Sequence, residues 1–458
     1  TPALISNSLF QTLLQILPRI DDSIELQKTI LSALELFTEG RPDNCLSFFQ
    51  EQYYPFIMSL IKFSDDDTIS VPNYEIAKYG LGILANIVKT SDEFSSNLFN
   101  LGIFNDLMQL LSILTVESNS PNRLEEHRTL LEHIMKVITN FFKYPILQNV
   151  DAFAFMNDVY HQLPSFIFAG TGELNISFCL SSEKSSCLTF VRKLFININQ
   201  YDDDELKLHF IEQFNDEQIL HWVLEQLRSN NVEEDGIDSC VIKCALEALI
   251  AVSGFSVPES LRPQYPGPFE FTLINDPIFL DSLQTPKLND ECFSTLIAII
   301  YRNLAASDDL NVIQFIFRKH QMIKFVVNQI DKSYAIKWES VFFFINLLLF
   351  LVNEESVEFI DELKSWLDYN PAILEAITEM LFNPYEDKKR DALLNGILLI
   401  LRIGEQTNGY DTPNKYAQIF YQNDLLDQLN DLEEVDDNLL QKIKDIMEDA
   451  LQFDQNEE

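Results

Sequence analysis

Glycine is scarce in this chain, with 12 positions among 458 residues, and no uninterrupted apolar run is long enough to cross a membrane. The low glycine content argues against turn-rich all-β folds, while 47% hydrophobic residues argue against intrinsic disorder. The longest apolar segment, residues 340–353, falls short of the roughly 20 residues that a transmembrane helix needs. We therefore expect this segment to be a buried helix of a soluble, helical protein.

Basic residues are also few. The chain has 32 Lys and Arg against 71 Asp and Glu, which gives a net charge of −39 at pH 7. Such a charge repels the phosphates of nucleic acids and anionic lipid surfaces, and it attracts basic partners. We therefore expect no nucleic-acid partner and no membrane partner.

Catalytic and metal-binding patterns are missing. The six histidines are scattered, and the six cysteines include no CxxC pair. Cys240 and Cys244 are one helical turn apart, but no histidine or further cysteine lies close in sequence to complete a zinc site. We expect the cysteines to be reduced and buried. The sequence predicts no catalytic residue, no metal and no cofactor, and hence a binding protein instead of an enzyme.

A recurring unit joins an apolar, asparagine-bearing helix to a polar turn and a second apolar helix. The predicted asparagine-bearing helices are residues 74–89, 130–142, 188–199, 292–306 and 338–352. Their asparagines are Asn86, Asn140, Asn197, Asn303 and Asn346, spaced 54, 57, 106 and 43 residues apart. Helices that are apolar almost all round are buried only by stacking on neighbours, which is how a solenoid is built. The spacing lies near the armadillo and HEAT repeat length.

This pattern predicts an all-α, armadillo-repeat solenoid of about nine repeats over residues 1–451, followed by an acidic tail, residues 452–458. The predicted second helices are residues 94–114, 206–214, 312–330 and 357–367. Each follows Ser, Asp or Glu residues that suit a helix N-cap. The polar residues 171–186 and the proline-rich residues 256–290 are predicted to be insertions between repeats.

Residues 392–432 resemble the last repeats of importin alpha (karyopherin alpha), a family of nuclear import adaptors. The matching residues are Ile400, Leu401, Arg402, Gly404, Glu405, Asn414, Tyr416, Leu426 and Asp427. The resemblance covers most of the chain in a more dilute form. It implies a right-handed superhelix whose groove binds basic localisation-signal segments of cargo proteins. It also implies an importin-beta-type carrier and an export receptor as partners, and a location in cytoplasm and nucleus.

In that family, a Trp and an Asn one turn apart form a ladder along the groove. The asparagines clamp the peptide backbone, and the tryptophan faces form slots for Lys and Arg. The resemblance therefore implies a set of cargo-peptide-binding residues in this chain, namely Asn86, Asn140, Asn197, Asn303 and Asn346, with Phe342 in place of one tryptophan. The residues four positions before these asparagines are Gly82, Lys136, Lys193, Ile299 and Phe342. The tryptophans are thus missing, and Lys136 and Lys193 repel a basic peptide if they point into the groove.

Two functional hypotheses remain open. The chain is either an import-adaptor-like protein with an acidic, peptide-binding groove, or an armadillo scaffold that binds a folded partner without the ladder. The asparagine series has its own alternative, in which each side chain pairs with a neighbouring backbone and sets the register of the repeats.

Overall fold

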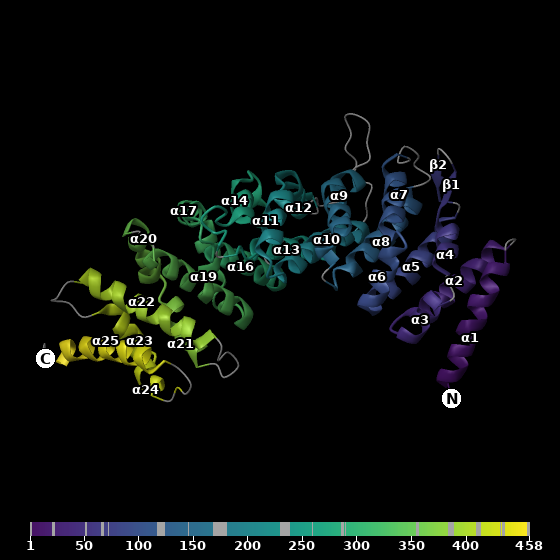
Figure 1. Ribbon diagram of the computed structural model, residues 1–458. Helices are drawn as coiled ribbons and strands as arrows, with labels where there is room; N and C mark the ends of the chain where they lie inside the picture. The colour runs from purple at the N-terminus through teal and green to yellow at the C-terminus, as the bar shows by residue number, and fades with distance from the viewer. Residues whose placement is uncertain are drawn as a thin grey trace. The chain divides into compact units, whose positions relative to one another are not determined.

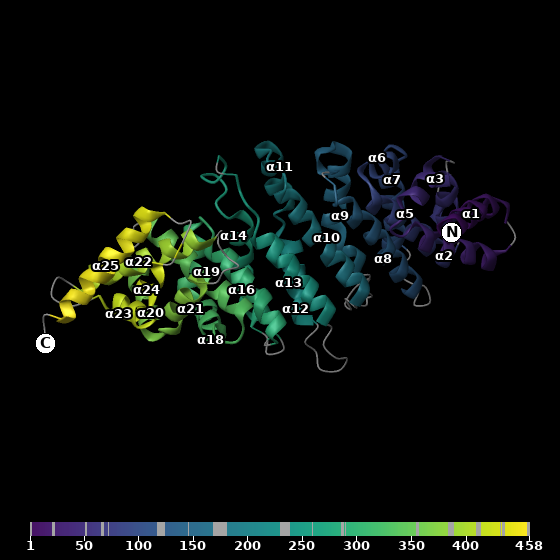
Figure 2. The same cartoon turned by 90° about the horizontal axis from the view of Figure 1, so that it is seen from below.

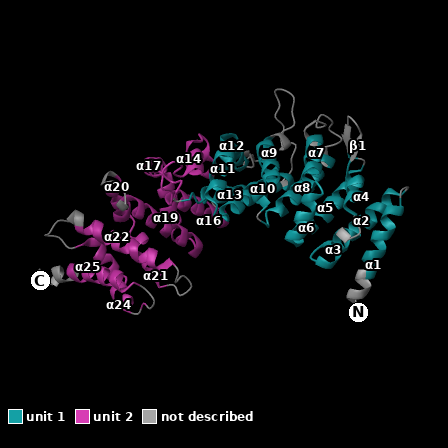
Figure 3. Ribbon diagram, in the orientation of Figure 1, with its two compact units in different colours: residues 1–258 teal, residues 259–458 magenta. Residues whose placement is uncertain are grey.

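The chain forms helices along most of its length, as the computed structural model shows (Figure 1). The structure describes residues 2–20, 23–50, 53–65, 68–71, 73–116, 124–144, 146–167, 181–229, 239–258, 260–284, 288, 290–353, 357–382, 389–408, 414–430, 432 and 436–455. These residues fall into two compact units, unit 1 (residues 1–258) and unit 2 (residues 259–458), coloured separately in Figure 3. The expectation of one continuous solenoid over residues 1–451 stays a prediction.

Unit 1 holds the first thirteen α-helices of the described chain. Their bounds are α1 Pro2–Ile16, α2 Ile24–Thr38, α3 Pro42–Gln50, α4 Tyr53–Ile61, α5 Tyr74–Thr90, α6 Asp92–Asn100, α7 Ile103–Val116, α8 Leu124–Phe141, α9 Val150–Ile167, α10 Ser181–Asn199, α11 Asp204–Phe214, α12 Glu217–Ser229 and α13 Ser239–Ser253. Short 3₁₀ helices cover Leu17–Arg19 and Ile146–Gln148. The antiparallel strands β1 (Phe63–Asp65) and β2 (Thr68–Ser70) form a hairpin.

Unit 2 continues the helical order. Its helices are α14 Pro268–Asn275, α15 Phe279–Leu283, α16 Glu291–Ala305, α17 Leu310–Lys319, α18 Gln321–Gln329, α19 Tyr334–Asn353, α20 Val357–Tyr369, α21 Ala372–Leu381, α22 Arg390–Asn408, α23 Lys415–Gln422, α24 Leu425–Leu429 and α25 Asp437–Gln455. α25 therefore includes the first four residues of the predicted tail. The helix α19 is long and apolar enough to cross a membrane by length and composition, but 67% of its apolar window is buried inside the protein. We read it as a core helix.

Within each unit, one helix of each repeat packs on the corresponding helix of the next repeat. In unit 1 these helices are α2, α5, α8, α10 and α13, and in unit 2 they are α16, α19, α22 and α25. We call them the ladder helices. In Figure 2 the ladder helices α5, α8, α10 and α13 follow one another along unit 1. Pairs of helices such as α6 and α7, or α11 and α12, lead from one ladder helix to the next. This order confirms the prediction of an all-α solenoid of helical repeats.

The predicted helix starts are confirmed where a polar turn follows a ladder helix. Ser91, Asp203 and Asp309 each cap a helix, because their side-chain oxygens accept from backbone amides of α6, α11 and α17 at 3.2, 3.0 and 2.8 Å. Each cap satisfies an amide that the helix leaves without an intrahelical partner. The turn residues thus place the start of the next repeat.

Two predicted helices are wrong in length. The segment 94–114 is divided into α6 and α7 at Gly102, which has φ +87°, and 312–330 is divided into α17 and α18 at His320, which has φ +39°. A residue with positive φ reverses the local helical path. The apolar pattern runs through both breaks, so periodicity alone merges two helices into one.

The predicted insertions also need correction. Residues 256–290 contain α14 and α15, which precede the ladder helix α16 as the first two helices of its repeat. Pro268 lies at the first position of α14, where its missing amide costs no hydrogen bond. Of the segment 171–186, residues 181–186 belong to the ladder helix α10, and the rest lies outside the described residues.

Candidate functional site

The structure places all five predicted asparagines on ladder helices. Asn86, Asn140 and Asn197 lie on α5, α8 and α10 of unit 1. Asn303 and Asn346 lie on α16 and α19 of unit 2. Within each unit these helices are consecutive neighbours.

Most of the asparagine amides bond to the preceding ladder helix or to the turn that follows it. The Nδ2 atom of Asn86 donates to the carbonyl of Glu35 at 3.0 Å, and that of Asn140 donates to the carbonyl of Ala85 at 2.9 Å. In unit 2, Asn346 donates to the carbonyl of Arg302 at 3.2 Å. Each of these bonds joins two repeats at one register and uses at least one N–H of the amide inside the protein.

Asn197 has the most complete set of partners. Its Nδ2 atom donates to the carbonyls of Phe142 at 2.9 Å and Tyr144 at 3.2 Å, just after α8 ends. Its Oδ1 atom accepts from the Tyr201 hydroxyl at 3.2 Å, and that hydroxyl also accepts from the Leu147 amide at 3.1 Å. The side chain is 2% exposed. These contacts satisfy carbonyls that the end of α8 leaves without intrahelical donors.

Asn303 differs from the rest of the series. Its Oδ1 atom accepts from the Arg302 guanidinium at 2.9 Å, and Arg302 also forms an ion pair with Glu339 of α19 at 2.6 Å. Arg302 therefore links α16 to α19 through its side chain, while its carbonyl accepts from Asn346.

Gly82, four positions before the first asparagine, lies where another side chain takes the space. A Cβ atom on Gly82 would overlap the carboxyl of Glu35 on α2. Burial raises the pKa of Glu35, and the nearby Lys136 and Lys78 partly oppose this rise. A tryptophan at position 82 would require the Glu35 side chain to move.

Charge is distributed unevenly within unit 1. Its five ladder helices carry nine Lys and Arg against eight Asp and Glu, while the rest of unit 1 carries seven against 27. The exposed and half-buried positions on the ladder helices recur mostly three or four residues apart and so share a face, as Lys136 and Asn140 do on α8 and Lys193 and Ile196 on α10. Lys/Arg and Asp/Glu are therefore nearly balanced on the ladder helices of unit 1, and the expectation of an acidic groove stays a prediction.

The lysines at the predicted ladder positions lie on this face. Lys136 is exposed and Lys193 is half-buried. Burial lowers the pKa of Lys193, and the positive charges of Arg192 and Lys89 lower it further. Arg192 is paired with Glu247 of α13 at 2.7 Å, whereas Lys89, Lys136 and Lys193 form no ion pair with any described residue. These three lysines are therefore without a salt bridge among the described residues, while the half-buried carboxyl of Glu35 lies near Lys136.

In unit 2, two aromatic side chains of α19, Trp338 and Phe342, lie beside the ammonium group of Lys389. The rings of Trp338 and Phe342 are 4.7 Å apart, and the Lys389 ammonium lies 4.4 Å from the first ring centroid and 5.3 Å from the second. Phe342 is buried and Trp338 lies on the same ladder helix, two turns before Asn346. Phe342 thus takes part in a cation–π site, with a lysine of this chain as its cation.

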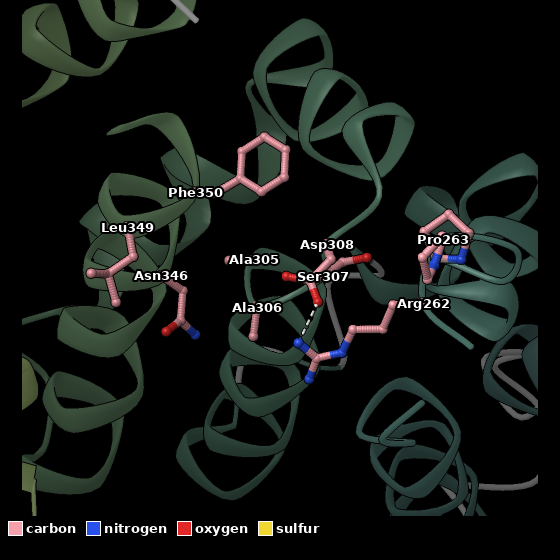
Figure 4. Close-up of a pocket in the computed structure, with 10 residues that line it drawn as sticks. Arg262, Pro263, Ala305, Ala306, Ser307, Asp308, Asn346, Leu349 and Phe350 are labelled. Carbon is pink, nitrogen blue, oxygen red and sulfur yellow. Dashed lines mark ion pairs between the residues drawn. The ribbon is translucent and has the colours of Figure 1, made fainter. Parts of the chain in front are cut away.

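A pocket of about 490 Å³ lies in unit 2 beside Asn346. Figure 4 shows Asn346, Leu349 and Phe350 of α19 on one side and the ion pair of Arg262 with Asp308 on the other. The ion pair spans 3.2 Å and both side chains are largely exposed. The pocket combines one amide, one ion pair and an apolar wall, which suits binding more than catalysis.

The described residues contain no group of three or more His, Cys, Asp or Glu side chains placed to hold a metal ion. Among the described cysteines, Cys45 and Cys187 are buried as expected, but Cys240 and Cys292 are exposed. The expectation of uniformly buried cysteines is therefore wrong for these two. Cys179 lies outside the described residues.

Three of the residues that carry the family resemblance in unit 2, Gly404, Asn414 and Tyr416, form a packing motif. Asn414 caps α23, since its Oδ1 atom accepts from the Tyr416 amide at 3.1 Å, and its Nδ2 atom donates to the Leu401 carbonyl of α22 at 2.7 Å. A Cβ atom on Gly404 would overlap this asparagine. The Tyr416 hydroxyl donates to Asp368 of α20 at 2.7 Å. The motif thus joins α20, α22 and α23.

Replacing Asn414 by Ala should lower the free energy of unfolding by about 2–3 kcal/mol, because a buried bond to Leu401 and a helix cap are lost together. Urea unfolding followed by circular dichroism measures the change. Asn395→Ala is the control, since Asn395 is exposed on α22 and bonds only within its own helix, to the Asp391 carbonyl. Equal losses of unfolding free energy in the two variants would contradict a structural role for the Asn414 motif.

Comparison with known proteins supports the fold. No family model matches the chain, and no curated protein matches it in sequence. An engineered protein, solved as a structural genomics target, is 14% identical, with a TM-score of 0.56 over 97% of this chain and 98% of that chain. A designed armadillo repeat protein is 14% identical over 63% of this chain and 97% of its own, with a TM-score of 0.39. Another, solved in complex with the peptide (KR)4, is 16% identical over 64% and 98%, with a TM-score of 0.36. At these identities the first likeness shows the fold alone, and the two lower scores carry no conclusion.

Proposed function

We propose that this chain is a helical-repeat scaffold that binds an extended segment of a partner protein across the ladder helices of unit 1. The observation that carries the proposal is the exposed face shared by consecutive ladder helices, each of which packs on the next. Neighbouring helices lie about 8–10 Å apart, so an extended segment of about 12 residues reaches across all five. The proposed role is binding without catalysis.

The exposed face combines polar and apolar contacts. Ile196 is 41% exposed on α10 and lies one turn from Lys193. An extended segment can place alternate side chains against such a surface while its backbone stays solvated or bonds to polar side chains. The asparagines contribute mainly to the register of the helices beneath this surface.

Selection from a random-sequence peptide library against the full chain tests this function. Peptides that bind should lose about three- to eight-fold in affinity with Ile196→Ser, because full burial of an aliphatic side chain contributes about 1.5–3 kcal/mol and Ile196 has 41% of its surface left to bury. Val150→Ser is the matched control, since Val150 is 81% exposed on α9, away from the ladder helices. A library that yields no binders, or binders that respond only to Val150→Ser, would sink the proposal.

A second candidate is a nuclear import adaptor that binds basic cargo segments, with an importin-beta-type carrier and an export receptor as partners in cytoplasm and nucleus. The net charge of −39 and the lysine held by Trp338 and Phe342 favour it. Titration with a basic localisation peptide tests it, repeated with Asn86→Ala and Asn140→Ala. If these variants leave the affinity unchanged, the asparagine ladder has no part in cargo binding.

A further inference from the structure

We propose that the ladder surface of unit 1 selects an acidic extended segment, rich in Asp and Glu, of a partner protein. This inference rests on the proposed scaffold function and names the chemistry of the segment bound. The ladder surface is defined here by the exposed and half-buried side chains of α5, α8 and α10, together with Lys143 just after α8. The elements that form this surface carry more Lys and Arg than Asp and Glu, whereas the remainder of unit 1 carries more Asp and Glu.

Cations from three successive repeats converge on this surface. Lys143 follows α8, and its Nζ atom donates to the carbonyl of Lys89 at the end of α5, at 2.8 Å. Lys193 of α10 lies close enough to Arg192 and Lys89 to feel both charges. Lys136 of α8 and Lys78 of α5 both act on the carboxyl of Glu35. Lysines of the neighbouring helices α5, α8 and α10 thus contribute to this surface, with the Glu35 carboxyl of α2 near two of them.

Much of this charge has no salt-bridge partner within the described residues, although the half-buried carboxyl of Glu35 lies near Lys136 and Lys78. Lys89, Lys136 and Lys193 form no ion pair there, although 35 Asp and Glu are present in unit 1. Lys193 is in addition half-buried, which removes part of its hydration without supplying an anion. A carboxylate bound beside it would restore a counter-charge in a partly desolvated setting, where ion pairs are stronger than at a fully exposed surface.

The occupant is an acidic protein segment and not a nucleic acid. Outside α5, α8, α10 and Lys143, unit 1 carries 30 Asp and Glu against eight Lys and Arg, so a long polyanion that leaves the ladder surface meets strong repulsion. A short segment with a few carboxylates stays within the basic surface, and an aliphatic side chain of the same segment can cover Ile196. A basic segment is disfavoured by the same lysines.

The experiment titrates the full chain with three peptides about 15 residues long that share their aliphatic residues and carry acidic, neutral or basic residues between them. A single-stranded oligonucleotide is the fourth ligand. We expect the acidic peptide to bind at least ten-fold more tightly than the other three. We also expect its affinity to fall as salt rises, because the contacts are ionic.

Charge-reversal variants test whether the acidic peptide binds at the ladder surface. The double variant Lys136→Glu with Lys193→Glu should weaken binding of the acidic peptide at least ten-fold. The control is Arg19→Glu with Arg228→Glu, which makes the same charge change at exposed positions of unit 1 off the ladder helices and should change affinity by no more than about two-fold. Circular dichroism checks that both variants fold.

Three results overturn the inference: a basic or neutral peptide that binds as tightly as the acidic one, equal losses in the two double variants, or an oligonucleotide that binds more tightly than the acidic peptide. If a neutral or basic peptide binds and responds to Ile196→Ser, the scaffold function survives while the acidic preference is lost. If no peptide binds at all, both fail.

Discussion

Replacing Asn197 by Ala should lower the free energy of unfolding of unit 1 by about 3–4 kcal/mol. The variant loses two donated bonds and one accepted bond of a side chain that is 2% exposed. It leaves two carbonyls after α8 and the Tyr201 hydroxyl with fewer partners, and each buried polar group left without a partner costs about 1–3 kcal/mol. Urea unfolding followed by circular dichroism measures the loss.

Asn105→Ala is the matched control for this prediction. Asn105 is exposed on α7 of the same unit, so the same substitution there removes no buried contact. We expect a change within about 0.5 kcal/mol, as for surface positions in general. If Asn197→Ala costs no more than this control, the asparagine does not hold the repeats in register.

The second large effect is expected at Glu270 of unit 2 and depends on pH. Glu270 is 5% exposed on α14, and its Oε2 atom has no hydrogen-bond partner. Burial, with smaller contributions from the charges of Asp309 and Asp308, raises the pKa of Glu270 to about 8. The carboxyl is therefore neutral in the folded protein at pH 7.

The raised pKa means that the folded state binds a proton that the unfolded state releases above pH 4.5. Below that pH both states are protonated and the group has no effect on stability. As the pH rises from 4.5 to 8, this group lowers stability progressively, by about 5 kcal/mol in total. Glu270→Gln removes the titration, so its advantage over the wild type should grow across this range and level off above pH 8.

Urea unfolding of both proteins at pH 4.5, 6, 7 and 8.5 measures the difference. Glu375→Gln, at an exposed position of α21, serves as the control and should show no such growth. A difference between Glu270→Gln and the wild type that stays constant with pH would show that Glu270 is ionised in the folded protein.

The repeats could be predicted from the sequence because each ladder helix is apolar on most sides and is followed by a capping residue. Ser91, Asp203 and Asp309 mark helix starts by local chemistry alone. The breaks at Gly102 and His320 could not be predicted, since the apolar pattern continues through both. The helices α14 and α15 were missed because prolines favour turns in general, while here Pro268 begins a helix.

The asparagine positions were found from the sequence, but their partners were not. The bond from Asn140 joins residues 55 positions apart, which periodicity along one helix does not reveal. The charge of the ladder surface was also missed. The net charge of the whole chain masks it, although Lys136 and Lys193 had been singled out by their spacing from the asparagines.

The packing role of Gly82 could not be predicted from the sequence. Its position suggested a lost tryptophan, whereas in the structure it makes room for Glu35 from the preceding ladder helix. Such a contact depends on the packing of two helices, so a single sequence carries no local sign of it.

Site-specific photocrosslinking tests the central claim, that a partner segment lies across the ladder helices of unit 1. A photoreactive residue is placed at position 196 on α10 and, in a second protein, at position 150 on α9; both sites are exposed. The acidic peptide is added to each, and the adducts are mapped by mass spectrometry. The account predicts peptide adducts from position 196 and none from position 150. Adducts from position 150 alone would contradict it.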